Sequence, residues 1–467
     1  MVNSKISRRR FLQSATSAAA GALCLNAMPA ASQPPNIVFI LADDLGYADL
    51  GCYGQQQIMT PNLDQMATEG TRFTQCYAGA TVCAPSRCCL LTGLHGGHAR
   101  VRDNLPNDIW LRPDDFTIGE LLKQAGYRTG AVGKWSMGDP GSWGLPNYQG
   151  FDYFYGHLSQ IQAHQYYPDH LWENEKHVLL RGNRGGTSEQ YTQDLFTEKA
   201  LDFIRGNAER PFFLYLAYTT PHWSDFPKDS PESQQVPSDA PYSDREWPQV
   251  EKNYAAMVTR LDADCGKISA LLKELGIDSN TIVFFSSDNG PSAERIHSVD
   301  FFDSNGPLRG SKRDLYEGGI RVPMIVRCPG RVPGGRVSDQ PWAFWDVLPT
   351  IAALAGLPDP ENTDGISMLP ALTGDKQTEQ HDYFYWDYGH VRGSFAQAVR
   401  TGNWKGIRQG MEESVALYNL DVDPGESADV AADNPDVVRQ IEGYMKEAFV
   451  PSPDYPIAPL SKEPGAI

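Results

Sequence analysis

The chain has 467 residues, of which 41% are hydrophobic, and it is long enough to fold as one large core with a smaller additional unit. Its 40 basic and 58 acidic residues give a formal net charge of −18, which excludes binding to nucleic acid by bulk electrostatic attraction. An anionic substrate would therefore need a local positive site inside a field that is negative overall.

The first stretch, residues 1–31, predicts an export signal rather than a part of the fold. A basic cluster, KISRRR, precedes an Ala-rich apolar run that is too short to span a membrane. SRRRFLQ resembles the bacterial twin-arginine motif, with Arg8 and Arg9 as the pair, and an ordinary Sec signal is the alternative. Leu23 is too bulky for a lipid-attachment site at Cys24, so no stable membrane anchor is expected. We expect export to the bacterial periplasm or the extracellular space, with the twin-arginine translocase as a partner.

The strands predicted in this chain are continuous apolar runs that end at polar residues. Runs of this length fit strands that are buried on both faces, as in a mostly parallel sheet. In chain order they cover residues 37–41, 128–134, 212–218, 282–285 and 322–326, and the first four end at Asp43 and Asp44, at Lys134, at His222, and at Asp288 and Asn289.

Helical signals lie between these strands. Thr60 is placed as the N-cap of a helix that ends at Gly70, and Thr117 and Glu120 have the spacing of a capping box. Residues 250–276 form a long amphipathic pattern. The alternation of strands and helices predicts an α/β fold.

The oxygen-rich strand ends predict a site for a hard cation. In open parallel sheets, ligands collect at the carboxyl ends of the strands, so Asp43, Asp44, Asp288 and Asn289 can converge although they are far apart in the chain. A loop or a helix cap would account for one such acidic pair. Two oxygen-rich strand ends favour Ca²⁺ or Mg²⁺, which bind carboxylate and amide oxygens.

Cys83 occupies an unusual position among the seven cysteines that follow the signal. Seven is an odd number for an exported chain, and no CxxC pair indicates a zinc site. Pro85 suits the first turn of a helix that ends near Gly93, which places Cys83 at the helix N-terminus, one turn before Arg87. A thiol in this position is expected to have a lowered pKa and to be reactive. A buried structural cysteine, or a thiol nucleophile with a histidine base, are the alternatives.

The segment from Cys83 to Arg87, CAPSR, resembles the C-x-P-x-R signature of the type I sulfatases. Its continuation LLTG is similar to that family too, as are NIVFILADDLG and SSDNG at the two oxygen-rich strand ends, LRGSKRDLYEGG, and LYNLDVDPGESADVA near the C-terminus. The resemblance spans residues 36–450. It implies an alkaline-phosphatase-like α/β fold, in which a catalytic domain of residues 36–375 holds a large, mostly parallel central sheet flanked by helices. A shift in composition at LTGDKQTEQHD predicts a C-terminal α+β subdomain, residues 380–455, with a small antiparallel sheet and a helix.

The resemblance also implies the chemistry at position 83. A formylglycine-generating enzyme would oxidise Cys83 to Cα-formylglycine, and a hydroxyl of the hydrated aldehyde would attack the sulfur of a sulfate ester. One Ca²⁺ per chain would be bound by residue 83 together with Asp43, Asp44, Asp288 and Asn289.

The resemblance also implies catalytic roles for four further side chains. Arg87 is implied to stabilise the hydrate, and Lys134 and Lys312 to hold sulfate oxygens and offset charge on the leaving oxygen. His222 corresponds to the histidine that is proposed to protonate the leaving oxygen.

One position departs from the family pattern. Many relatives have GKWHLG where this chain has GKWSMG, so Ser136 stands in place of a histidine that is proposed to deprotonate the second hydroxyl of the hydrate. Serine is a poor base at neutral pH. His164 is the candidate for this role. Alternatively, His164 is only a loop or substrate-pocket histidine. The other histidines in the sequence that could act as this base are His95, His98 and His170.

The sequence therefore predicts a sulfuric ester hydrolase that removes sulfate from a sulfated carbohydrate or an aryl sulfate. A phosphonate or phosphate ester hydrolase of the same superfamily is an alternative, and parallel turnover of nitrophenyl sulfate and phosphate would separate the two. A non-catalytic protein that binds sulfated glycans is a second alternative, which predicts binding without release of sulfate. The sugar, the position of the ester, the disulfide pairing and the oligomeric state remain open at this point.

Overall fold

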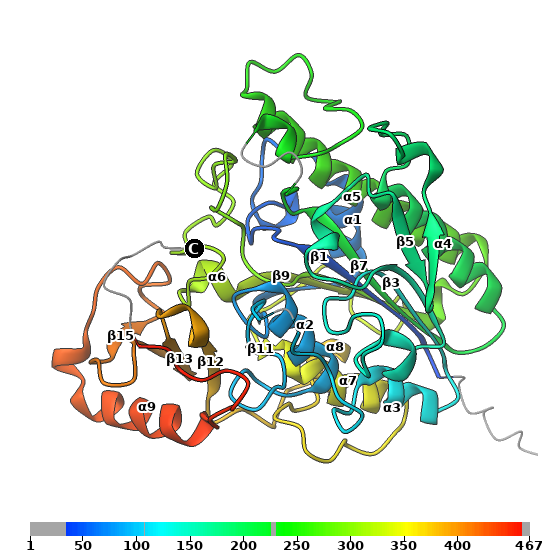
Figure 1. Ribbon diagram of the computed structural model, residues 1–467. Coiled ribbons are helices and arrows are strands. Elements are labelled where there is room, and N and C mark those ends of the chain that lie inside the picture. Colours follow the sequence, from blue (N-terminus) through cyan, green and yellow to red (C-terminus); the bar gives the residue numbers. More distant parts are fainter. Residues whose placement is uncertain (1–33, 107, 226–229, 460–467) are drawn as a thin grey trace, which may run out of the picture. The chain divides into compact units, whose positions relative to one another are not determined.

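The computed structural model describes residues 34–106, 108–225 and 230–459 (Figure 1). The predicted export signal, residues 1–31, lies outside these residues. Within the described part of the chain, no helix is long and apolar enough to cross a membrane. The seven cysteines after the signal are all free thiols.

The central sheet is mixed but mostly parallel at its middle. Its strands are β1 (Asn36–Asp43), β2 (Thr71–Tyr77), β3 (Arg128–Lys134), β4 (Tyr153–His157), β5 (His170–Glu173), β6 (Lys176–Leu179), β7 (Phe212–Pro221), β8 (Thr281–Ser287), β9 (Arg321–Arg327), β10 (Arg336–Ser338) and β11 (Trp342–Ala343). Their order is β10-β2-β9-β8-β1-β7-β3-β4-β5-β6, and β11 also pairs with β2. The run from β8 through β1, β7 and β3 to β4 is parallel, whereas β9, β5 and β6 are antiparallel to their neighbours. The predicted fold class is confirmed.

Helices cover both faces of this sheet (Figure 1). The helices are α1 (Pro61–Glu69), α2 (Cys83–Thr92), α3 (Ile118–Gln124), α4 (Thr192–Asn207), α5 (Gln249–Glu274), α6 (Glu317–Ile320), α7 (Val347–Leu354), α8 (Leu369–Thr373) and α9 (Pro435–Ala448). One hydrophobic cluster joins the sheet to α2, α3, α7 and α8, and a second joins it to α1, α4 and α5. The strands are buried on both faces for this reason, which is why their sequences are continuously apolar.

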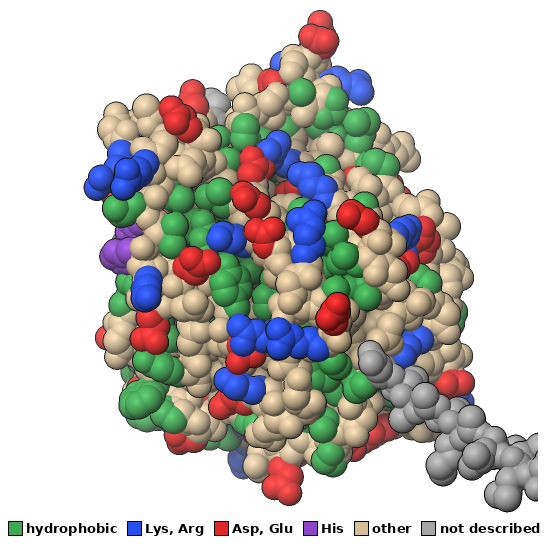
Figure 2. Space-filling model, turned by 90° about the vertical axis from the view of Figure 1, so that its right-hand side faces the viewer, with side chains coloured by type: hydrophobic (Ala, Val, Ile, Leu, Met, Phe, Trp, Pro, Cys, Tyr) green, Lys and Arg blue, Asp and Glu red, His purple; other side chains and the backbone are tan. Residues whose placement is uncertain are grey.

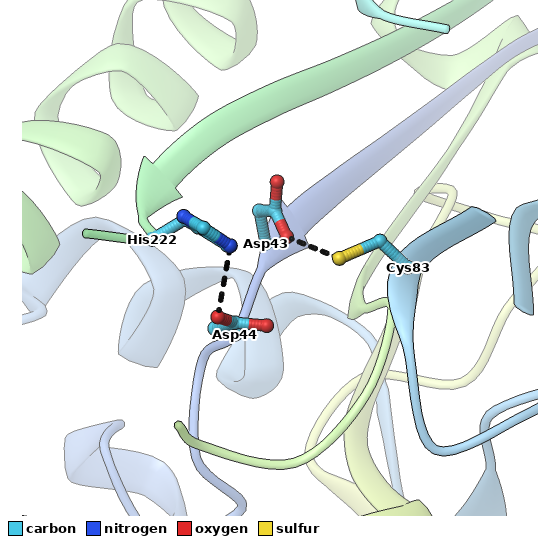
Figure 3. A group of neighbouring side chains, drawn as sticks. All are labelled: Asp43, Asp44, Cys83 and His222. Atoms are coloured by element: carbon cyan, nitrogen blue, oxygen red, sulfur yellow. Dashed lines mark hydrogen bonds and ion pairs between the residues drawn. The ribbon is translucent and has the colours of Figure 1, made fainter. Parts of the chain in front are cut away.

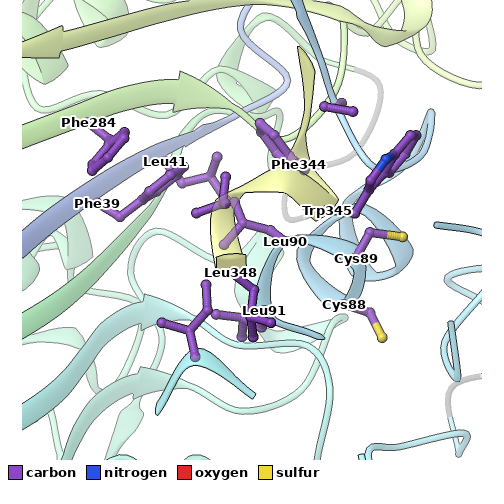
Figure 4. Packing of buried hydrophobic residues seen from close by; sticks show 14 of the residues in the cluster. Phe39, Leu41, Cys88, Cys89, Leu90, Leu91, Phe284, Phe344, Trp345 and Leu348 are labelled. Atoms are coloured by element: carbon purple, nitrogen blue, oxygen red, sulfur yellow. The ribbon is translucent and has the colours of Figure 1, made fainter. Parts of the chain in front are cut away.

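Helix α2 is buried along its whole length, which fixes the position of its first residue. Cys88, Cys89, Leu90 and Leu91 pack among side chains of β1, β8 and α7 (Figure 4). Gly93 follows α2 in a left-handed conformation, with φ of 71°, and its N–H donates to the carbonyl of Cys89, as the sequence predicted. Burial of the helix therefore holds Cys83 at the edge of the sheet.

The other capping predictions concern the first residues of helices α3 and α1. Thr117 and Glu120 form the predicted capping box at the start of α3. Thr60 occupies the predicted N-cap position before α1, but its hydroxyl makes no capping hydrogen bond to the helix. It accepts a hydrogen bond from the N–H of Gly51 (2.8 Å) and donates one to Asp64 (3.2 Å) instead.

A second, smaller sheet lies near the C-terminus. It is antiparallel, in the order β12 (Phe384–Tyr388), β13 (Ala396–Thr401), β14 (Trp404–Gln409) and β15 (Ala416–Asn419). Helix α9 packs against it through a hydrophobic cluster that includes Ile441 and Met445. The predicted small antiparallel sheet and helix are confirmed, while the boundaries of the two predicted domains, 36–375 and 380–455, stay predictions.

Charged side chains on the protein surface do not gather by sign on the face shown in Figure 2. Acidic and basic residues lie interspersed there, with apolar side chains between them. This face therefore offers no large patch of positive charge for an anionic substrate.

Candidate functional site

Four neighbouring strands deliver polar residues to one edge of the central sheet. Asp43 ends β1 and Asp44 follows it with φ of 63°, Lys134 ends β3, and Asp288 and Asn289 follow β8. His222 follows β7, and Cys83 begins α2 beside them. All of these residues are buried. The structure thus brings together the residues that the sequence places at separate strand ends.

The centre of this group is formed by Asp43, Asp44, Cys83 and His222 (Figure 3). One ligand atom from each of them lies within 4.8 Å of all the others. The Sγ of Cys83 lies 3.3 Å from Oδ1 of Asp43, and Nε2 of His222 lies 3.4 Å from Oδ2 of Asp44.

Each of the three carboxylates gives one oxygen to a different cationic side chain. Lys134 Nζ lies 2.8 Å from Oδ2 of Asp43, and Lys312 Nζ lies 2.9 Å from Oδ2 of Asp44. The guanidinium of Arg87 binds Oδ2 of Asp288 through two nitrogens, at 2.9 and 2.7 Å, and donates to the carbonyl of Lys134 at 3.0 Å. These ion pairs offset the free-energy cost of burying the charges, and they hold the side chains of the two lysines and the arginine in place.

The remaining oxygens of this group can hold a cation. The Oδ1 atoms of Asp43, Asp44 and Asp288 are not bound by the three basic side chains. Oδ1 of Asn289 is buried and has no hydrogen-bond partner, while its Nδ2 donates to Asp44 at 2.8 Å. Burial and the neighbouring Asp43 carboxylate raise the pKa of Asp288 to about 7. A hard dication fits this set of oxygens, because it would satisfy the amide oxygen and stabilise the carboxylates in their charged form.

The environment of Cys83 corrects one expectation from the sequence. Burial and the neighbouring Asp43 carboxylate raise the pKa of the Cys83 thiol to about 12. The predicted lowering of this pKa at a helix N-terminus is therefore wrong, because desolvation and a carboxylate at 3.3 Å outweigh the helix end and the nearby cations. As a thiol, Cys83 is a poor nucleophile.

His222 and Lys312 form a hydrogen-bonded pair. Nδ1 of His222 lies 2.6 Å from the carbonyl of Trp223, which makes Nδ1 the protonated nitrogen and directs the lone pair of Nε2 toward Lys312 Nζ at 3.2 Å. Burial and the Lys312 charge lower the pKa of His222 well below its usual range. The His222 ring is therefore neutral, and it accepts a hydrogen bond from the lysine.

His164, the candidate for the missing base, lies against this pair. Its ring stacks on the ring of His222 with centroids 4.1 Å apart, and its Nδ1 lies 2.8 Å from Oδ2 of Asp225. Its Nε2 lies 3.3 Å from the side-chain amide of Gln160. The sequence analysis did not identify Asp225. Its position three residues after His222 was the one signal that it could be the partner of a histidine.

Ser136 lines a small cavity that also touches Ala84, the residue after Cys83. Its hydroxyl is buried without a hydrogen-bond partner, and its backbone has φ of 69°. Ser136, Ala84 and Gln160 all line the cavity, which has about 10 Å³ for the centre of a water-sized sphere. Gln160 therefore connects this cavity to His164.

The other candidate histidines bind elsewhere. His98 contacts Asp364 at 2.9 Å, and Nδ1 of His95 accepts from the N–H of Gly97. His170 binds Asp169 at 2.6 Å. None of these contacts, among the described residues, reaches the group around Cys83.

A mostly parallel sheet with acidic and basic groups at its carboxyl edge is consistent with the alkaline-phosphatase-like superfamily. Within it, the family model described as Sulfatase matches residues 35–357, and the model described as N-sulphoglucosamine sulphohydrolase, C-terminal, matches residues 310–450. The chain belongs to the sulfatase family and is a sulfuric ester hydrolase.

Several known sulfatases are similar over most of the chain. N-acetylgalactosamine-6-sulfatase of Canis lupus familiaris is 36% identical over 405 residues, which are 80% of this chain and 72% of that protein. Arylsulfatase A of Homo sapiens is 33% identical over 483 residues, which are 90% and 89% of the two chains. The crystal structure of Ps i-CgsB in complex with k-i-k-neocarrahexaose superposes with a TM-score of 0.76 at 32% identity, and the match covers 92% of this chain and 96% of that one. The predicted family is confirmed.

Proposed function

We propose that the chain removes sulfate from a sulfated saccharide at the group around position 83, and that Cys83 acts as Cα-formylglycine rather than as a thiol. The environment of the thiol carries this proposal. Its pKa of about 12 leaves almost no thiolate at neutral pH, although three basic side chains surround the position.

Two of the three basic side chains would bind the sulfate group, and the third would stabilise the nucleophile. Formylglycine at position 83 would supply a hydrated aldehyde, one hydroxyl of which attacks sulfur and displaces the alcohol. Arg87 is held by Asp288 and the Lys134 carbonyl, so it can stabilise negative charge at position 83 without moving. Lys134 and Lys312, already fixed by carboxylates, would hold the sulfate oxygens.

A bound Ca²⁺ would polarise the sulfate oxygens. We propose that it is bound by Asp43, Asp44, Asp288 and Asn289, with residue 83 completing its coordination. The unpartnered amide oxygen of Asn289 and the raised pKa of Asp288 support this assignment.

Lys312 and His222 would together deliver a proton to the leaving oxygen. His222 is neutral, so its Nε2 has to receive a proton before it can donate one. The ammonium of Lys312, at 3.2 Å, can give up this proton only as negative charge develops on the leaving oxygen, because its neighbouring carboxylates raise the pKa of Lys312 and burial lowers that of His222. Protonation of the leaving oxygen through this pair would agree with the role that the resemblance implies for His222.

A saccharide is the substrate that the relatives favour. One similar protein is an N-acetylgalactosamine-6-sulfatase, and another is bound to a neocarrahexaose in its crystal structure. A sulfated polysaccharide or oligosaccharide is therefore the first class to test.

The proposal is tested by the mass of the peptide that contains Cys83, followed by turnover. We expect that peptide to have lost sulfur and two hydrogens and to have gained one oxygen. Purified protein should release sulfate from a panel of sulfated saccharides, and it should hydrolyse 4-nitrophenyl sulfate faster than 4-nitrophenyl phosphate. A thiol at position 83 in fully active protein would contradict the proposed nucleophile. Binding of sulfated sugar without sulfate release would favour a binding protein, and faster phosphate hydrolysis would favour the phosphatase alternative.

Maturation and export would follow a fixed order. Cys83 is completely buried, so we propose that the formylglycine-generating enzyme acts on the chain before it folds. The twin-arginine translocase, which carries folded proteins, would then export the chain to the periplasm or beyond.

We further propose that His164, oriented by Asp225, replaces the base that is lost at Ser136. Because Nδ1 of His164 donates to a carboxylate, its Nε2 carries the lone pair, which accepts a hydrogen bond from the side-chain amide of Gln160 (3.3 Å), a residue that lines the cavity. His164→Ala is expected to lower kcat by on the order of 10²-fold, and Asp225→Asn by about 10-fold.

The measurement is pre-steady-state release of 4-nitrophenol. If His164 acts after the alcohol has left, the variant should show a burst of nitrophenol followed by a slow phase. His98→Ala is the control, because that histidine binds Asp364 and should keep wild-type kinetics. Wild-type turnover in His164→Ala would remove His164 from the mechanism.

A further inference from the structure

The loop that carries Lys312 has no regular structure for most of its length, yet its lysine is placed between Asp44 and His222. Lys312 itself is 5% exposed. Within the loop, the N–H of Gly318 donates to the carbonyl of Arg309 at 2.7 Å, which closes residues 309–318 into a ring. What fixes this ring to the rest of the fold decides where the lysine lies.

Both ends of the ring bind one residue of the C-terminal subdomain. Nη1 of Arg309 donates to the backbone carbonyl of Glu426 at 2.8 Å. The N–H of Glu317 donates to the side chain of Glu426, at Oε2, at 2.6 Å. Arg309 also lies over the ring of Tyr316, 3.9 Å from its centroid, which keeps its side chain directed to this contact.

Glu426 is held in an unusual state by its surroundings. It is completely buried, and its backbone has φ of 50°, which is uncommon for a residue other than glycine. Lys405 on β14 binds both Oε1 of Glu426 (2.9 Å) and Oε1 of Glu317 (3.0 Å). A residue in this backbone conformation persists only where the surrounding contacts hold it.

We infer that Glu426 is a positioning residue for Lys312, through which the C-terminal subdomain fixes the active-site loop. Resting on the function proposed above, this inference gives the C-terminal subdomain a part in catalysis, because the loop after β15 holds both ends of the ring that places the Lys312 ammonium. Displacement of a binding group by about 1 Å can cost up to 10²-fold in rate.

The test combines Glu426→Gln with a double-mutant cycle. Glu426→Gln keeps the shape of the side chain but removes the charge that binds Lys405, and it is expected to lower kcat/KM for 4-nitrophenyl sulfate by about 10-fold. It should also weaken competitive inhibition by inorganic sulfate, since Lys312 holds sulfate oxygens. In a Lys312→Ala background, the same substitution should change kcat/KM by less than about 2-fold.

Two further variants keep the test decisive. Arg309→Met removes the hydrogen bond from Arg309 to the Glu426 carbonyl. Because Arg309 is exposed, this variant should fold even if Glu426→Gln does not, and it should also raise the inhibition constant for sulfate. Glu412→Gln, an exposed residue of the same subdomain, is the control and should match the wild type.

The outcomes separate this inference from the proposed function. If Lys312→Ala retains full activity, the proposed role of Lys312 fails and the inference fails with it. If Lys312→Ala has strongly reduced but measurable activity while Glu426→Gln and Arg309→Met keep the wild-type inhibition constant for sulfate, only the inference is overturned. Equal losses from Glu426→Gln in both backgrounds would also overturn it, because they would indicate a general effect on folding.

Discussion

Replacing Cys83 with alanine is expected to lower kcat/KM for a sulfate ester by on the order of 10⁴-fold or more, because the substitution removes the only atom that can be converted into the proposed nucleophile. The fold should survive. The lost side-chain atoms leave a small space at the edge of the sheet, and its cost should be about 1 kcal/mol.

Cys88→Ala is the matched control for this prediction. Cys88 lies on the same helix, is equally buried, and belongs to the hydrophobic cluster on that face of the sheet. It should show a similar fall in Tm and near wild-type turnover. Residual turnover by Cys83→Ala above about 1% of the wild type would show that residue 83 is not the nucleophile.

Removal of divalent cations by a chelator is expected to lower turnover by on the order of 10²-fold or more and to lower Tm by several degrees. Restoring Ca²⁺ should recover both. The physical reason is that three buried carboxylates, those of Asp43, Asp44 and Asp288, lie close together at one edge of the sheet. The nearby basic side chains offset their charges, but the carboxylates still repel one another.

The size of the Ca²⁺ effect on Tm should depend on pH. Aspartate has a pKa of about 3.9 in an unfolded chain, whereas burial and Asp43 raise that of Asp288 to about 7 in the folded protein. Between these values the folded, cation-free chain binds a proton that the unfolded chain has lost, so its stability falls as pH rises through this window. Because Ca²⁺ favours the charged carboxylate, the gain in Tm should be larger at about pH 8 than at about pH 5.

Two variants check the assignment of this effect. Asp288→Asn should abolish the pH-dependent part of the Ca²⁺ effect. Asp262→Asn changes a buried carboxylate that binds Asn62 and the N–H of Leu63 on α1, away from the site, and it should lower Tm without altering the response to Ca²⁺. An identical response in both variants would contradict the proposed cation ligands.

Much of the fold could be predicted from the sequence because the central strands are buried on both faces. Continuous apolar runs such as residues 37–41 and 282–285 are typical of such strands when regular helical signals lie between them. The carboxyl ends of parallel strands then bring their polar residues together by topology alone. The N-cap position of Thr60 was predicted too, but the partner of its hydroxyl was not, since that hydroxyl accepts from the N–H of Gly51 in place of an N–H of the helix.

The protonation states of the site residues could not be predicted from the sequence. A helix N-terminus and Arg87 indicated a reactive thiol, but the sign of the pKa shift at Cys83 depends on its burial and on a carboxylate from β1, 40 positions earlier in the chain. The contacts of Asp225 and Glu426 depend in the same way on three-dimensional neighbours. Their residue types are common in loops, and no spacing distinguishes them.

The three carboxylates and three basic side chains of the site cancel in formal charge, and the proposed Ca²⁺ would leave two positive charges. A sulfate monoester has one negative charge, whereas the inorganic sulfate that leaves has two. The site is thus matched to its product more closely than to its substrate, and departure of sulfate is the step that this arrangement slows. The acidic exterior works in the opposite direction, because a chain with a formal charge of −18 repels a dianion once it has left the pocket and reduces its return.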